Sequence, residues 1–109
     1  MAKKPAWPTP IPVGLALERV GEDVAAWRKL QGLTAAQLAS RAGITTRTLW
    51  NIEHGDGATF ENVLRVARVI GLLDKLAGAL DPYDTDVGRL RSDENLPQRV
   101  RSRRVTRDG

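Results

Sequence analysis

The chain has 109 residues and a formal net charge of +4, and this length allows one domain with tails and a modest core. It contains no cysteine and a single histidine, so disulfides and thiolate zinc sites are excluded and we expect neither metal nor cofactor. No apolar run approaches the ~18 residues of a membrane-spanning helix and no signal peptide precedes the body, so we expect a cytoplasmic protein that is nucleoid-associated when bound to DNA.

The N-terminal segment, "KKPAWPTPIPV" from Lys3 to Val13, carries four prolines at short spacing. Closely spaced prolines oppose a helix, so residues 1–13 are predicted to form an extended, polyproline-like arm. Trp7 either anchors this arm or is a stray aromatic side chain in a flexible end.

Helical patterns follow the arm. Leu17, Val20, Val24 and Trp27 recur at spacings of three and four, which predicts a first helix that buries this stripe, with Trp27 in the core. A second helix starts at Thr34, where Thr34 and Gln37 have the spacing of a capping box, and ends at Gly43. Its inward side chains are predicted to be Leu38, Ala39 and Ala42.

Three more helices are predicted before residue 82. Thr45 caps the third and Thr59 caps the fourth, which ends at Gly71. The fifth covers residues 72–80 and stops before Asp81-Pro82. Residues 82–109 form a C-terminal extension with at most one short helix near residues 87–91. The sequence therefore predicts an all-α fold, with a five-helix domain at residues 14–81.

The second and third helices carry the most informative pattern. Two helices that cross steeply need a small residue where they touch, which Ala39 supplies, and Gly43 tolerates the positive φ of a tight turn. Leu49 and Ile52, with Ile44, hold the third helix against the body. Its opposite face is thereby directed outward and bears Thr46, Arg47, Trp50 and Asn51.

The stretch "GLTAAQLASRAGITTRTLWNIEHG" resembles the helix-turn-helix of the phage-repressor-like (XRE/Cro) family, and the resemblance extends from about Val20 to Leu80. It implies a third helix that enters the major groove of DNA. Base contacts are implied for Thr46, Arg47, Trp50 and Asn51. Phosphate contacts are implied for Thr45 and Thr48.

The first residue of the second helix is Ala35, where relatives often have a DNA-contacting glutamine. At Thr34 and Ala35 the helix N-terminus itself is the predicted phosphate contact. The alternative for Trp50 is packing sideways against the second helix. His54 is interpreted as a helix-end cation or cap.

The resemblance also implies an ion pair and a dimer. Arg28 and Glu53 match a family pair that joins the first and third helices and fixes their register. Family members commonly pair through the fifth helix, which places Leu73, Leu76 and Leu80 at a twofold interface on a palindromic operator.

The two ends of the chain hold its excess positive charge. Residues 14–81 contain eight basic and eight acidic residues, so the body is neutral. Basic tails suit an anionic polymer, and Arg101, Arg103 and Arg104 are predicted phosphate contacts; the alternative is a merely solubilising tail.

Residues 80–104 also resemble the extension of HipB-type antitoxins, which implies repression of the protein's own operon and a HipA-like kinase toxin as a partner. We therefore predict a dimeric, sequence-specific DNA-binding repressor and no enzyme activity. The alternative is a protein-interaction module with incidental DNA affinity.

Overall fold

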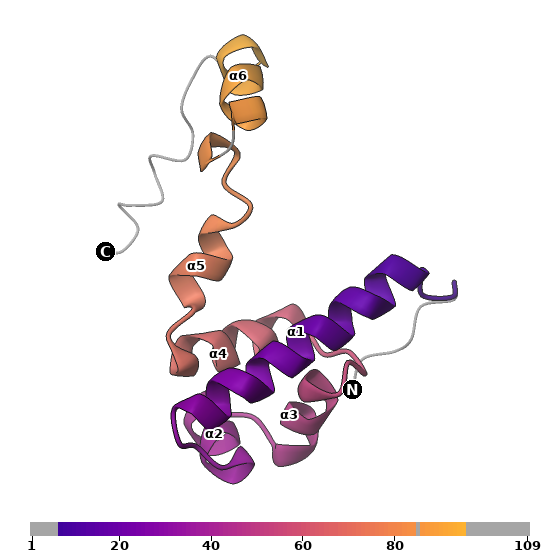
Figure 1. Cartoon of the computed structure of the whole chain (residues 1–109), viewed down its shortest axis with the longest axis vertical. Coiled ribbons are helices and arrows are strands. Elements are labelled where there is room, and N and C mark those ends of the chain that lie inside the picture. The colour runs from indigo at the N-terminus through magenta and orange to yellow at the C-terminus, as the bar shows by residue number, and fades with distance from the viewer. Residues whose placement is uncertain (1–6, 85, 96–109) are drawn as a thin grey trace. The chain divides into compact units, whose positions relative to one another are not determined.

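The computed structural model describes residues 7–84 and 86–95, and all regular structure in these ranges is helical, which confirms the predicted all-α fold (Figure 1). The chain divides between Asp74 and Lys75 into two units. The elements are α1 (Ile11–Leu30), α2 (Ala35–Ala42), α3 (Thr46–Glu53), α4 (Phe60–Ile70), α5 (Leu73–Gly78), the 3₁₀ helix η1 (Pro82–Asp84) and α6 (Asp86–Asn95).

Helix α1 begins inside the segment that was predicted to be extended. Its N-cap is Pro10 and its first turn contains Pro12, so the prediction of an extended backbone as far as Val13 was wrong for residues 11–13. The N–H groups of a first helical turn have no partner within the helix. Proline therefore costs no hydrogen bond there, and its fixed φ already suits a helix.

The buried face of α1 differs from the predicted stripe. Gly21 and Val24 are its buried residues, whereas Trp27 is 41% exposed and Val20 is 47% exposed. The placement of Trp27 in the core was therefore wrong. The other helices of the first unit pack against the face of α1 that carries Gly21 and Val24. The side chains of Val20 and Trp27 therefore lie at the margin of this contact.

The predicted N-terminal caps of α2, α3 and α4 and the turn at Gly43 are confirmed. The Thr34 hydroxyl accepts a hydrogen bond from the Gln37 backbone N–H, and the Gln37 side chain accepts one from the Thr34 N–H, which completes a capping box. Thr45 and Thr59 cap α3 and α4 in the same way through their hydroxyl oxygens. Gly43 ends α2 with a φ of 74°, in the left-handed region that favours glycine.

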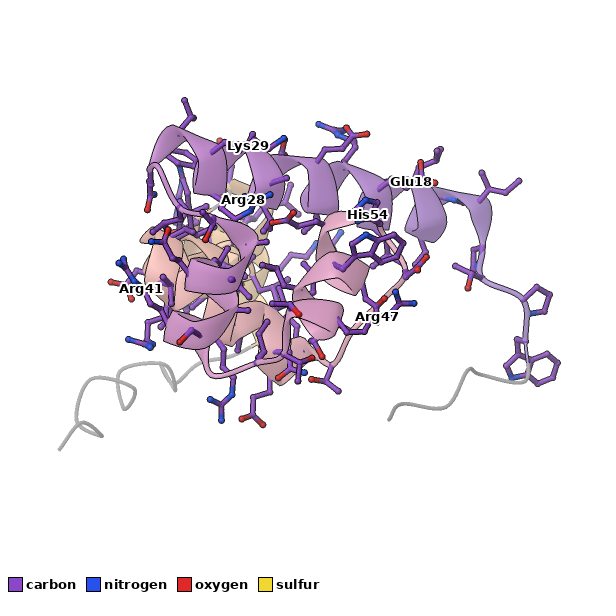
Figure 2. The ribbon with its side chains drawn as sticks, turned by 90° about the horizontal axis from the view of Figure 1, so that it is seen from below. Glu18, Arg28, Lys29, Arg41, Arg47 and His54 are labelled. Carbon is purple, nitrogen blue, oxygen red and sulfur yellow. The ribbon has the colours of Figure 1, made fainter. Side chains whose placement is uncertain are left out.

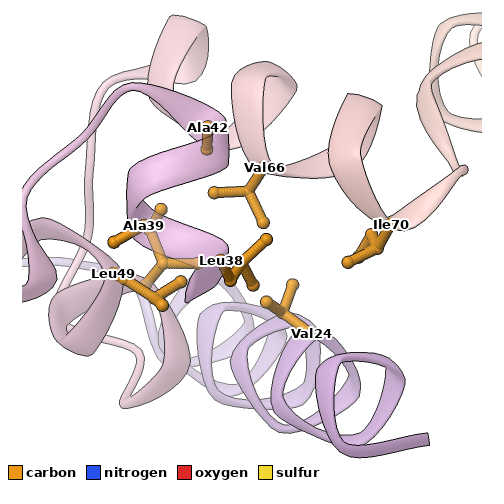
Figure 3. Packing of buried hydrophobic residues seen from close by; sticks show 8 residues of the cluster. Val24, Leu38, Ala39, Ala42, Leu49, Val66 and Ile70 are labelled. Atoms are coloured by element: carbon orange, nitrogen blue, oxygen red, sulfur yellow. The ribbon is translucent and has the colours of Figure 1, made fainter. Parts of the chain in front are cut away.

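The core of the first unit lies where α2, α3 and α4 meet above α1 (Figure 3). Leu38 and Leu49 are completely buried, and Val66 from α4 is 1% exposed. Ala39, also 1% exposed, lies on α2 beside Leu49 of α3, as the small residue expected at the crossing of these helices. The core therefore contacts only one face of α3, the face that carries Leu49.

The second unit contains most of α5, then η1 and α6. Helix α5 ends at Gly78, earlier than the predicted end at residue 80, and the Ala79 N–H there donates to the Leu76 carbonyl in an i+3 turn. Helix α6 is longer than the predicted segment at residues 87–91. It packs against η1, and Arg89 joins the two elements by donating to the Tyr83 carbonyl, while its bond to the Asp86 carboxylate lies within α6.

Candidate functional site

The two faces of α3 differ sharply in burial. Leu49 is completely buried and Ile52 is 5% exposed, so this face is fixed against the core. The opposite face carries the four residues predicted to contact bases. Of these, Thr46, Arg47 and Trp50 are exposed and Asn51 is half-buried. The structure therefore presents a polar and aromatic surface on a helix that cannot rotate without disrupting the core.

Two threonine hydroxyls meet at the N-terminus of α3. Thr45 accepts a hydrogen bond from the Thr48 backbone N–H and donates its own proton to the Thr48 hydroxyl, both at 3.0 Å. The Thr48 hydroxyl keeps its own proton for a further acceptor. The N-terminus of a helix carries a partial positive charge, and so does that of α2, which follows Thr34. Both ends have the chemistry that suits a phosphate oxygen.

An ion pair ties the C-terminal end of α3 to α1. The Arg28 guanidinium donates to the Glu53 carboxylate at two points, at 2.8 and 3.0 Å, and also donates to the Leu33 carbonyl at 3.1 Å. The side chains of Arg28 and Glu53 are 13% and 8% exposed. Hydrogen bonding to Glu53 raises the pKa of Arg28, although burial opposes this rise. The pair therefore fixes the register between α1 and α3.

Gly21 allows α1 and the end of α3 to approach each other, a role that the sequence pattern did not predict. A Cβ atom at Gly21 would lie 2.4 Å from the Ile52 carbonyl oxygen and 2.6 Å from that of Glu53. Glycine in the middle of a helix costs about 1 kcal/mol relative to alanine. A glycine inside a predicted helix, at a position where no turn requires it, is the feature of the sequence that indicates close approach of another backbone.

The exposed face of α3 also contains a stack of side chains that was not predicted. The His54 ring lies parallel to the Trp50 indole, with 3.8 Å between ring centroids and 12° between planes. The Arg47 guanidinium lies over the same indole, 4.8 Å from its centroid. His54 is the C-cap of α3, which confirms its predicted capping role, and Figure 2 shows it on the same side of the unit as Arg47.

Residues 24–74, from the middle of α1 to the start of α5, match a family model described as helix-turn-helix. This part of the chain is an XRE-type helix-turn-helix domain. Helix-turn-helix domains of this family bind double-stranded DNA in transcription regulators and are typically not enzymes. No curated protein and no solved structure matched the chain.

The residues predicted for the dimer interface lie at and beyond the end of the helix-turn-helix domain. Leu73 is half-buried, Leu76 is 36% exposed and Leu80, after the end of α5, is 85% exposed. The predicted phosphate contacts Arg101, Arg103 and Arg104 lie outside the described residues. Among residues 7–84 and 86–95, no helix is long and apolar enough to cross a membrane, and no cluster of three or more potential metal ligands occurs.

Proposed function

We propose that this protein is a dimeric repressor that reads a palindromic DNA operator with α3 in the major groove and represses its own operon. The proposal rests on the asymmetric burial of α3. Its apolar face is fixed in the core and its C-terminal end is tied to α1 by Arg28 and Glu53. The face with hydrogen-bonding side chains is thereby held outward, as a rigid element that fits the major groove.

The proposed base contacts follow from the side-chain chemistry of that face. Arg47 presents a guanidinium that matches the two acceptors of guanine, and Asn51 offers the donor and acceptor that match adenine. Thr46 offers a hydroxyl to either kind of base edge. The exposed part of the Trp50 indole provides an apolar surface for thymine methyl groups.

The proposed phosphate contacts surround this face. Thr45 and Thr48 lie at the N-terminus of α3, and Thr34 and Ala35 lie at that of α2. Backbone N–H groups and hydroxyls at these ends position the duplex without reading its sequence. The basic C-terminal extension, residues 82–109, adds attraction to phosphate through Arg101, Arg103 and Arg104.

We further propose a twofold dimer, in which Leu73, Leu76 and Leu80 of each chain form the interface. The exposure of Leu76 and Leu80 supports this proposal, because apolar side chains of this size gain free energy when a partner covers them. A dimer of this kind would contact two half-sites about 34 Å apart, or one helical turn.

The decisive experiment selects bound DNA from a random library and then measures binding of the full chain to the preferred site. Arg47→Ala is expected to lose about 1–3 kcal/mol on that site and to relax discrimination at one base pair. Asn51→Ala is expected to act in the same way at a different base pair. Arg19→Ala removes an exposed arginine from α1 and serves as the control. Equal losses on preferred and random DNA would show that Arg47 contacts only phosphate.

A second candidate function is protein binding, as in an antitoxin that neutralises a HipA-like kinase toxin. A shallow hollow of about 50 Å³, lined by α1, α3, α4 and the loop before α4, favours it. The hollow is almost entirely apolar, and such surfaces commonly receive a side chain of a partner protein. The absence of any preferred sequence in the DNA selection would favour this candidate. The residues that line the hollow are Leu17, Val20, Ile52, Gly57, Ala58 and Val63.

A further inference from the structure

His54 lies outside the set of proposed base contacts, yet it is joined to two of them. The Trp50 carbonyl accepts two hydrogen bonds from His54, one from its backbone N–H and one from Nδ1–H, both at 2.9 Å. The second bond joins the imidazole to the last turn of α3, and the ring stacks on the Trp50 indole. The indole is thus held by its stack on the ring of His54.

The same indole carries Arg47. The guanidinium lies 4.8 Å from the ring centroid, within the range of a cation–π interaction. Arg47, Trp50 and His54 have the spacing i, i+3 and i+7, which places them on one face of the helix. Trp50 is the middle residue and can contact both of the others. An exposed arginine otherwise samples many rotamers, and restricting those rotamers on binding DNA reduces affinity.

We propose that His54 is a positioning residue for sequence readout, because it holds the Trp50 indole as the platform that preorganises Arg47 for its base. This inference rests on the proposed function, in which Arg47 reads a base pair. His54 acts through Trp50 and need not touch DNA. The stack reduces the number of Arg47 conformations before binding, and this advantage is realised in full only where Arg47 meets its matching base.

The test uses the full chain and three variants at one position. His54→Ala removes the ring, His54→Gln keeps a hydrogen-bonding side chain without a ring, and His54→Phe keeps an aromatic ring without its nitrogens. Two quantities are measured for each. The first is the ratio of Kd values for the preferred site and for a site altered at the base pair that Arg47→Ala identifies. The second is the NMR shift of the Arg47 side-chain protons in the free protein, which the indole ring current displaces.

We expect His54→Ala and His54→Gln to reduce the discrimination ratio by about two- to tenfold, as removal of one stacking interaction implies, with unchanged binding to random DNA. The Arg47 proton shifts should move toward random-coil values in both variants. His54→Phe should restore the discrimination ratio and the shifts. Loss of a helix cap alone would instead leave His54→Gln like wild type. Melting temperatures of all variants check that the fold is kept.

Three results would overturn the inference. Unchanged discrimination in His54→Ala, with Arg47→Ala still effective, would remove the positioning role and leave the proposed function intact. A His54→Phe variant as defective as His54→Ala would show that a ring nitrogen matters rather than the stack. If Arg47→Ala itself fails to relax discrimination at any base pair, the proposed reading role of Arg47 is wrong, and the inference is wrong with it.

Discussion

Gly21→Ala is expected to destabilise the protein although alanine is the better helix former. The new Cβ would lie 2.4 Å from the Ile52 carbonyl oxygen, whereas ordinary contact begins near 3.4 Å, so one backbone must withdraw by about 1 Å. No side-chain rotation relieves a contact between Cβ and a backbone atom. Overpacking costs about 1–3 kcal/mol. Withdrawal also stretches the 2.8 Å bond between Arg28 and Glu53, so the cost is expected at the upper end of this range.

The helix propensity of alanine returns about 1 kcal/mol, which leaves a net loss of about 1–2 kcal/mol. Thermal and urea unfolding, followed by circular dichroism, measure this loss. Gly14→Ala is the matched control, because Gly14 lies in the same helix and a Cβ atom there would meet no other part of the structure within 4 Å besides its own helix backbone. The control is expected to gain up to ~1 kcal/mol of stability. A Gly21→Ala protein as stable as the Gly14→Ala protein would refute the close approach of α1 and α3.

Two further predictions concern assembly and the tail. Leu76→Asp is expected to yield a helical monomer by sedimentation, because a charge at the proposed interface is left without a partner; a monomeric wild type that protects a single half-site would contradict the dimer. Removal of residues 97–109 is expected to weaken binding to all DNA alike and to flatten the log–log salt dependence by about 0.9 for each phosphate that the tail neutralises, without changing the preferred sequence. An unchanged slope, together with failure to capture a purified HipA-like kinase, would assign the tail to protein binding.

The caps of α2 and α3 and the turn between these helices could be predicted from short stretches of sequence. Thr34 and Thr45 each bond to a backbone N–H three residues ahead, so each cap is visible within four consecutive letters. Gly43 marks the turn for a similar reason, since a left-handed backbone at that point favours glycine. The outward face of α3 also followed from the sequence, because burying Leu49 and Ile52 leaves the opposite side exposed. Interactions within one helical turn can be predicted without knowing the rest of the fold, because both partners are close in the sequence.

The covered side of α1 depends on how the helices pack and could not be predicted from the sequence. The spacing of apolar residues allowed Trp27 in the core, but α3 approaches along Gly21, and this approach leaves Trp27 at the edge. A residue without a side chain contributes nothing to a hydrophobic pattern, so the pattern placed the centre of the contact too near Val20 and Trp27. The stack of His54 on Trp50 depended on rotamers, which remain open on an exposed face until neighbouring side chains are placed. The spacing of apolar residues predicts where the helices are, whereas the packing of the helix backbones against one another decides which side chains are in contact.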